Sequence, residues 1–230
     1  MTEFSELSHA FIVGCYYREL KKAFGERGVR AFAHMTILYG QQRGSRMAQR
    51  AIRDGKPLDF ASYRAYGEWQ STEAAIRCMG GFSSRILSVA PDHEEHIDRC
   101  PWAWQFEEMG LQECGVVYCT HLDQAIARGF NPYITFDVLQ SVNDHDCCIQ
   151  VMRDAQFSDG QTFPKDPKNV KGFDYHCGHL YKTFSEISGS VFGEEGEGIA
   201  AHVLTEFSQK YGGEMAGVLK SHLETNFLII

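Results

Sequence analysis

The stretch of residues 118–151 constrains the fold most, because it predicts a helix followed by a β-hairpin. Its first segment is rich in helix-forming and apolar residues and should end at Gly129, before an Asn-Pro turn. Tyr133–Val142 then alternates apolar and polar residues as a half-buried strand does, and Cys147–Met152 returns as a second strand after a polar turn. This order predicts that the returning strand carries its cysteines back toward the helix.

The rest of the chain predicts a mainly helical protein. Helical patterns cover residues 4–24, 27–53, 58–69, 101–109, 172–187 and, as one interrupted helix or a helix pair, 194–228. Residues 74–89 are divided by Gly80-Gly81 and otherwise read as strand, while the irregular loop 157–171 is either a functional lid or variable surface. We predict one α+β domain, mainly helical with a small antiparallel β-sheet. Within it, residues 1–70 are helical, residues 72–155 form a mixed region with the metal site, and residues 172–230 form C-terminal helices.

Composition narrows the class of protein. The 230 residues carry a net charge of −8 from 22 basic and 30 acidic side chains, which argues against nucleic acid or an anionic membrane as the main partner. No apolar run reaches the ~20 residues that span a bilayer, and the first residues are acidic where a signal peptide is basic, so we expect a cytoplasmic protein. In that reducing compartment the eight cysteines should be buried thiols, metal ligands or nucleophiles. A homodimer is the default expectation for a small enzyme.

Two residues of the predicted helix and one of the hairpin indicate a metal site. Cys119 and Asp123 lie four residues apart, on one helical face, and the hairpin carries Cys147 or Cys148 toward them. Zinc binds thiolate, carboxylate and imidazole tetrahedrally, and a catalytic site keeps one position for water. The alternative is that Cys119 is a small buried hydrophobe and Asp123 a surface charge.

His176 and His179 form a second candidate group, three residues apart on a predicted helix. Either imidazole completes a zinc shell or acts as a base near neutral pH, with Asp174 placed to orient one of them. The alternative is a polar helix face that carries two unconnected histidines.

Cys100 directly precedes the helix expected to begin at Pro101. The positive end of a helix lowers the pKa of a nearby thiol and favours the thiolate. Cys100 is therefore a candidate nucleophile or a further metal ligand. The alternative is a core thiol packed under Trp102 and Trp104.

The segment YGQQRGSR places two arginines on one face of the second predicted helix. Arg43 and Arg46 are three residues apart, one turn after Tyr39, and the arginine fork binds a carboxylate bidentately. The alternative is a solvated helix surface. Gly40 and Gly44 allow either close helix packing or the approach of a ligand.

The middle of the chain also carries a set of motifs. They are Cys100-Pro101, Tyr118-Cys119 with Asp123, Phe130-Asn131-Pro132 and Asn143-Asp144-His145-Asp146-Cys147. This set resembles the L-2-amino-thiazoline-4-carboxylic acid hydrolase family, which shows a Cys-Pro pair, a Cys near an Asp on a helix, and a Gly-Asp-x-x-Cys turn. Asn143 stands where the family has glycine, and asparagine tolerates left-handed backbone. A more distant similarity is to 4-vinyl-reductase-type domains.

The resemblance implies a zinc-dependent hydrolase in which water attacks C2 of a five-membered ring that contains sulfur and nitrogen and bears a carboxylate. The outcome is either opening of an aminothiazoline ring or loss of sulfide from a thiohydantoin-like ring. Together with the patterns above, it implies zinc ligands Cys119, Asp123, Cys147 and His176, catalytic residues His179, Cys100 and Asp144, and substrate contacts from Arg43, Arg46 and Tyr39. The distant similarity implies the alternative, a ligand-binding or sensor domain with a structural zinc site.

Overall fold

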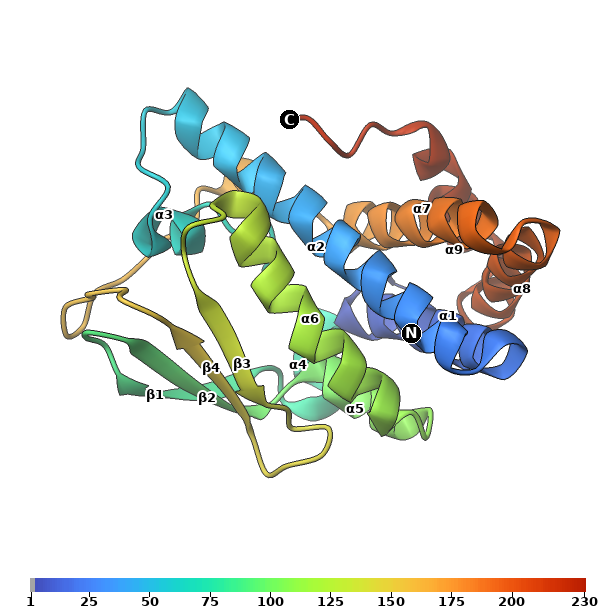
Figure 1. The fold of residues 1–230 in the computed structure, drawn as a ribbon, viewed down its shortest axis with the longest axis horizontal. Helices are drawn as coiled ribbons and strands as arrows, with labels where there is room; N and C mark the ends of the chain where they lie inside the picture. The colour runs from blue at the N-terminus through green and yellow to red at the C-terminus, as the bar shows by residue number, and fades with distance from the viewer. Residues whose placement is uncertain (1–2) are drawn as a thin grey trace.

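A layer of helices covers one face of a small antiparallel sheet in the computed structural model, which describes residues 3–230 (Figure 1). The helices are α1 Glu6–Phe24, α2 Glu26–Arg53, α3 Phe60–Ala65, α4 Glu73–Met79, α5 Pro101–Glu108, α6 Gln112–Phe130, α7 Phe173–Phe192, α8 Glu194–Tyr211 and α9 Gly213–Ser221. The strands are β1 Ser83–Ser88, β2 His93–Arg99, β3 Phe136–Gln140 and β4 Cys148–Met152. The predicted mainly helical α+β class is confirmed.

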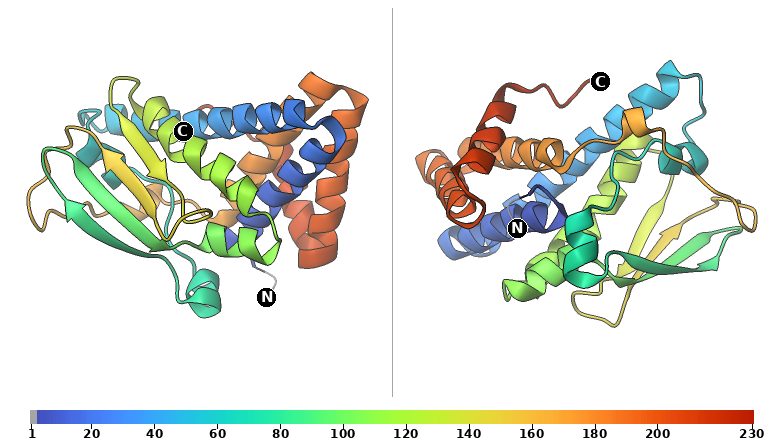
Figure 2. Two further views of the ribbon diagram at one scale, coloured as in Figure 1. Left: turned by 60° about the horizontal axis from the view of Figure 1, so that its bottom comes forward. Right: turned by 180° about the vertical axis from the view of Figure 1, so that it is seen from behind.

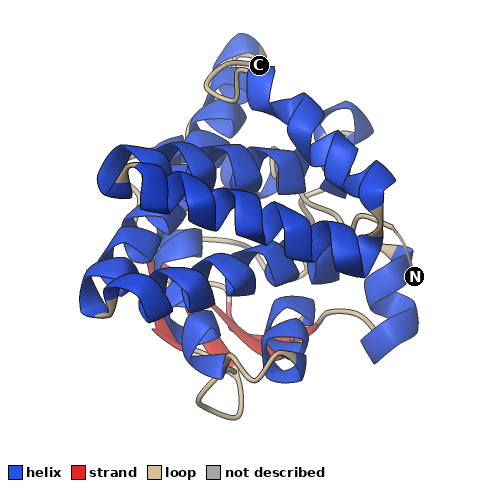
Figure 3. Cartoon of the chain, turned by 90° about the vertical axis from the view of Figure 1, so that its right-hand side faces the viewer, coloured by secondary structure: helices blue, strands red, loops and turns tan. Residues whose placement is uncertain are grey.

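The sheet has the order β1-β2-β4-β3, with every neighbouring pair antiparallel. The predicted hairpin forms from β3 and β4, and β2 pairs with the other edge of β4. Helix α6 crosses the inner face of this sheet, and the remaining helical layers lie beyond it (Figure 2, Figure 3). Because side chains alternate along a strand, every second residue of β2 and β4 points toward α6.

Glycines allow α2 and α6 to approach each other closely. A Cβ atom on Gly44 would lie 2.0 Å from the backbone oxygen of Ile126, and one on Gly129 would lie 2.3 Å from that of Gln41. Gly40 also faces α6, where an added Cβ would lie 2.7 Å from that of Ala125. The helix-packing interpretation of Gly40 and Gly44 is confirmed. The consequence is that the side chains of α2 near residue 43 reach the same space as those of α6 near residue 123.

The remaining helices form the main core around α1 and α7. Aromatic side chains dominate it, as in the edge-on contact of Tyr16 with Phe184 at 5.3 Å between ring centroids. Phe207 from α8 is fully buried in the same core. Within the described residues, none of the helices combines the length and the apolar character needed to cross a bilayer.

Several predicted boundaries were wrong for local reasons. Gly129 does not end α6, which continues to Phe130, because this glycine serves the contact with α2. The strand predicted over Tyr133–Val142 is confined to β3, and the segment 74–89 begins with helix α4, capped by the Thr72 side chain, before β1. Strand β2 was missed because its sequence HEEHIDR is mostly charged, although it pairs with β1 on one side and with β4 on the other.

Candidate active site

A cavity of about 590 Å³ lies between the inner face of the sheet and helices α2 and α6. Its floor is made by rows of paired strand residues, in which Gln150 lies opposite Glu95 and Cys148 lies opposite Ile97. The loop over residues 157–165 forms another wall. Most of the remaining lining is aromatic or aliphatic. This volume suits a small organic ligand held by few polar groups.

Arg43 extends from α2 into this cavity as a buried cation. Its residue is 9% exposed and its guanidinium carbon lies 5.6 Å from the centre of the Tyr39 ring. Its Nε atom has no hydrogen-bond partner among residues 3–230. A buried charge is costly unless an anion and hydrogen bonds accompany it. Arg43 is therefore suited to an anionic group of a ligand.

Other buried polar atoms without partners gather on the same walls. Six buried side-chain polar atoms lack a hydrogen bond among the described residues, and four of them belong to residues that line the cavity. These four are Arg43 Nε, Trp69 Nε1, Tyr118 OH and His93 Nδ1. Buried polar groups in folded proteins are normally satisfied, so this concentration indicates a polar ligand.

Asp123 is the carboxylate on the wall that is free of ion pairs in the described structure. The other two wall carboxylates, Glu68 and Glu95, each pair with arginine. Asp123 Oδ2 accepts a hydrogen bond from Gln150 Nε2 at 2.8 Å. Burial raises the pKa of Asp123 to about 6, although Arg43 and Gln150 favour its ionised form. Such a group takes up and releases a proton near neutral pH.

Three cysteines line the cavity, whereas Cys147, a predicted ligand, does not. Cys100, Cys119 and Cys148 are on the wall, and burial raises the pKa of each thiol. Cys147 points to the other face of the sheet, where its Sγ lies 3.8 Å from His96 Nδ1. The adjacent residue, Cys148, therefore faces Cys119, because neighbouring strand residues point to opposite sides.

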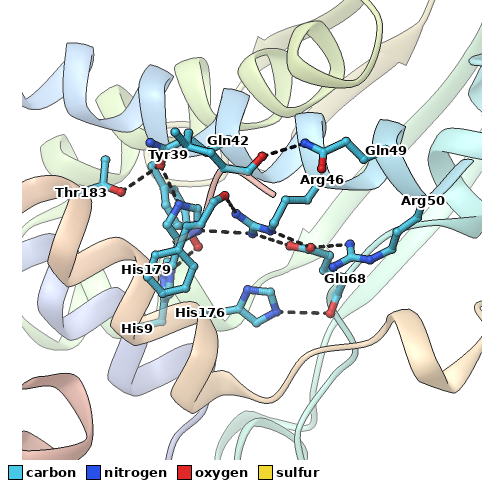
Figure 4. A network of polar contacts seen from close by, with 12 residues as sticks. His9, Tyr39, Gln42, Arg46, Gln49, Arg50, Glu68, His176, His179 and Thr183 are labelled. Carbon is cyan, nitrogen blue, oxygen red and sulfur yellow. Dashed lines mark hydrogen bonds and ion pairs between the residues drawn. The ribbon is translucent and has the colours of Figure 1, made fainter. Parts of the chain in front are cut away.

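His176 and His179 belong to a separate buried network (Figure 4). His176 Nε2 donates to the backbone oxygen of Glu68 at 3.2 Å, and His179 Nε2 donates to Gln42 Oε1 at 2.7 Å. Burial lowers the pKa of both histidines, that of His176 to about 3. Neither histidine lines the cavity.

Glu68 is the centre of this network. Arg46 donates to both of its carboxylate oxygens, at 3.1 and 2.7 Å, and Arg50 donates at 2.6 Å. Although burial opposes ionisation, the hydrogen bonds and charge of Arg46 hold the pKa of Glu68 at about 2. Glu68 touches the cavity wall, but both of its oxygens are occupied by arginines. Arg46 is thus engaged within the protein.

The structure therefore divides the ten predicted site residues into a group on the cavity wall and a group outside it. Those on the cavity wall are Arg43, Cys100, Cys119 and Asp123. Those outside it are Tyr39, Arg46, Asp144, Cys147, His176 and His179. Of these, Tyr39 bonds His9 through its hydroxyl at 3.0 Å, and Asp144 pairs with His145 on the exposed turn.

Two residues of the cavity wall, Cys148 and Lys165, were not among the site residues predicted from the sequence. Cys148 was left as an alternative to Cys147, and strand alternation alone does not say which face is inner. Lys165 lies on the 157–171 loop, donates to the backbone oxygen of Trp69 at 2.6 Å, and has its pKa lowered to about 8 by burial. The length and composition of this loop favoured a functional element, but nothing in the sequence distinguished Lys165 from its neighbours.

The predicted zinc set does not fit this arrangement. His176 is bonded to Glu68 in the network, and Cys147 lies across the sheet from Cys119, so the four side chains do not surround one point. In residues 3–230, the group of acids, histidines and cysteines whose ligand atoms lie within 4.8 Å of one another is elsewhere, at Glu19, His202 and Glu206. Arg18 pairs there with both carboxylates.

Comparison with known proteins supplies one match. A family model described as L-2-amino-thiazoline-4-carboxylic acid hydrolase matches residues 5–149, which include helices α1 to α6 and strands β1 to β3 and therefore most of the residues that line the cavity. No curated protein and no solved structure matches the chain in the same comparisons.

Proposed function

The chain belongs to the L-2-amino-thiazoline-4-carboxylic acid hydrolase family and is a hydrolase, and from this premise we propose that its cavity binds and opens an aminothiazoline ring that bears a carboxylate. The observation that carries the proposal is the buried Arg43 guanidinium facing the cavity, whose Nε atom has no hydrogen-bond partner within residues 3–230. A substrate carboxylate supplies the anion that this guanidinium lacks. Trp69 Nε1 and Tyr118 OH offer further hydrogen bonds to the same ligand.

The reaction adds one water to the ring. The water oxygen bonds to C2, the C2=N bond becomes C–N with a proton on nitrogen, and the C2–S bond breaks to leave a carbonyl and a thiol. Asp123 takes a proton from the attacking water and returns it to the departing sulfur, while the second water proton reaches the ring nitrogen. A carboxylate whose pKa lies near 6 is suited to both transfers at neutral pH.

Positioning supports this assignment of roles. Arg43 and Asp123 come from the two helices that Gly40, Gly44 and Gly129 allow into contact, and both line the same cavity, where the charge of Arg43 acts to lower the pKa of Asp123. Gln150 holds the Asp123 carboxylate at 2.8 Å from the sheet side. A ring held by its carboxylate at Arg43 thus lies beside the group that moves protons.

The test is turnover of L-2-amino-thiazoline-4-carboxylate by purified protein, with free thiol and free sulfide measured together. We expect thiol to appear in step with substrate loss and sulfide to stay at background. Release of sulfide from a thiohydantoin, with no thiol from the aminothiazoline, would assign the desulfuration reaction instead. Absence of both products from both rings would reject the proposed function.

A further inference from the structure

We propose that strand β2 supplies a second polar subsite to the cavity, in which Glu95 binds the exocyclic amino group on C2 of the ring. This β2 subsite consists of Glu95 and His93 on β2 and Arg64 on α3, all of which line the cavity. His93 and Glu95 are two residues apart on one strand, so their side chains project from the same face of the sheet. The inference rests on the proposed function, because it names the contact made by the part of that substrate which Arg43 does not bind.

Glu95 is an ionised carboxylate that can accept further hydrogen bonds. Its Oε1 accepts from Ser84 Oγ at 2.6 Å, and its Oε2 accepts from Arg64 Nη1 at 3.2 Å. Among residues 3–230, two hydrogen bonds thus reach this carboxylate, whereas its oxygens offer about four lone-pair sites. Although burial opposes ionisation, neighbouring donors and the charge of Arg64 hold the pKa of Glu95 at about 2. Glu68, by contrast, accepts from arginine at both oxygens.

His93 adds to the β2 subsite a buried donor without a partner. Arg64 Nη1 lies 3.2 Å from His93 Nε2, and because arginine only donates, Nε2 accepts this bond and the ring proton is on Nδ1. His93 is 3% exposed, and its Nδ1 atom has no hydrogen-bond partner within the described residues. Since Glu95 accepts and His93 Nδ1 donates, the pair matches a carbon that bears an amino group and gains an oxygen. C2 of the proposed ring becomes such a centre when water adds to it.

The β2 subsite adjoins the group that moves protons in the proposed reaction. Gln150 of β4 lies opposite Glu95 in the strand pairing and donates to Asp123 Oδ2 at 2.8 Å. Burial is the main cause that raises the pKa of Asp123, while the charge of Arg43 lowers it and that of Glu95 raises it. With the ring carboxylate at Arg43 and C2 beside Asp123, the substituent on C2 lies on the Glu95 side.

The chemistry of this contact selects between the two candidate rings. The amino group of an aminothiazoline donates N–H bonds to a carboxylate, and hydrogen bonds with a charged partner are the stronger ones. The exocyclic sulfur of a thiohydantoin-like ring carries lone pairs in place of these protons, so it would meet an ionised carboxylate without a donor between them. The β2 subsite therefore favours the ring that bears the amino group.

The test compares two aromatic analogues that differ only in the amino group, 2-aminothiazole-4-carboxylate and thiazole-4-carboxylate. Their Kd values are measured with full-length protein by isothermal titration calorimetry. We expect the parent to bind the amino compound about 10–100-fold more tightly, and Glu95→Gln to lose most of that preference. Glu94→Gln is the matched control and should keep the preference, because Glu94 pairs with His96 at 2.8 Å and does not line the cavity.

The ratio of the two Kd values separates a direct contact from a structural role. If Glu95→Gln only loosened the cavity, it would weaken both analogues equally and keep the parental ratio, which would overturn the inference. Equal affinities in the parent would also overturn it, and that measurement does not depend on the folding of any variant.

Arg43→Ala distinguishes failure of this inference from failure of the proposed function. This variant should weaken both analogues by the same factor and leave their ratio unchanged. A parent that binds both analogues equally, with both weakened in Arg43→Ala, would retain the carboxylate site and reject the β2 subsite. A parent that binds neither analogue would reject both.

Discussion

Two arginines one helical turn apart on α2 differ in the partners of their guanidinium groups. Arg46 is fully buried and donates to both oxygens of Glu68, and with Arg50 it completes a closed ionic network (Figure 4). Arg43 is also buried, but it faces the cavity and its Nε has no partner in residues 3–230. Charges that satisfy one another hold a structure together, whereas an unsatisfied buried charge beside a cavity is available to a ligand.

The carboxylates of the two regions show the same contrast. The network holds the pKa of Glu68 at about 2 despite burial, while burial in the cavity raises the pKa of Asp123 to about 6. Ionised Glu68 therefore stabilises the fold, and ionised Asp123 weakens it. Burial alone therefore does not identify a functional charge. What distinguishes the two carboxylates is whether neighbouring residues already form ion pairs with them.

The largest expected effect is on stability, from Glu68→Ala. Removing this carboxylate leaves Arg46 and Arg50 as uncompensated buried cations, which should lower the free energy of unfolding by about 3–5 kcal/mol in urea titrations. Glu113→Ala is the control, because its ion pair with Lys21 is exposed and should contribute less than about 1 kcal/mol. Equal losses in the two variants would break the distinction between the network and ordinary surface pairs.

Asp123→Asn should raise the free energy of unfolding, the opposite of the effect expected for Glu68→Ala. The folded pKa of about 6 exceeds the ordinary value of 3.8, so the ionised carboxylate costs the native state a penalty that grows between about pH 4 and pH 6 and persists above. In metal-free protein the variant should gain up to about 3 kcal/mol at pH 8 and little at pH 4, while losing turnover. A variant less stable than the parent at pH 8 would contradict this account of the cavity.

Arg43→Ala should raise KM for the carboxylate substrate by about 10–100-fold, because a charge-assisted hydrogen bond contributes roughly 1.5–3 kcal/mol. Unlike Glu68→Ala, it should leave the free energy of unfolding unchanged or higher. Arg53→Ala, an exposed residue on the same helix, serves as the control. An unchanged KM in Arg43→Ala would remove this residue from substrate binding.

The smallest effect on turnover is expected for His179→Gln. His179 lies in the closed network, where it bonds Gln42 and stacks on Phe227 at 4.4 Å, and it is not among the residues that line the cavity. Stability should fall, by about 1 kcal/mol per lost hydrogen bond, while kcat stays near that of the parent. A kcat that collapses in a folded His179→Gln protein would restore this histidine as the base that its sequence pattern predicted.

Local patterns in the sequence were enough to predict the mainly helical α+β class, the hairpin and the close packing at Gly40 and Gly44. They placed Cys119 and Asp123 on one face of α6, and the structure has both on the cavity wall. These features depend on spacing along one element, which periodicity reports directly.

The remaining choices depended on partners far away in the chain. Arg43 and Arg46 look alike on a helical wheel, and Glu68, 22 residues after Arg46, decides between them. Cys147 and Cys148 are adjacent, so only the face of β4 that meets α6 distinguishes them, and that face is set by pairing with the poorly recognisable strand β2. Tertiary context of this kind leaves no periodic signal.

The most direct measurement of the central claim crosses the Arg43→Ala change with removal of the carboxylate from the substrate. The quantity is kcat/KM for 2-amino-thiazoline-4-carboxylate and for 2-amino-thiazoline, each with parent and variant. If Arg43 binds the carboxylate, the parent should prefer the acid by about 10–100-fold, and the variant should lose that preference. An equal preference for the acid in both proteins would contradict the claim that the Arg43 guanidinium binds the carboxylate of the substrate.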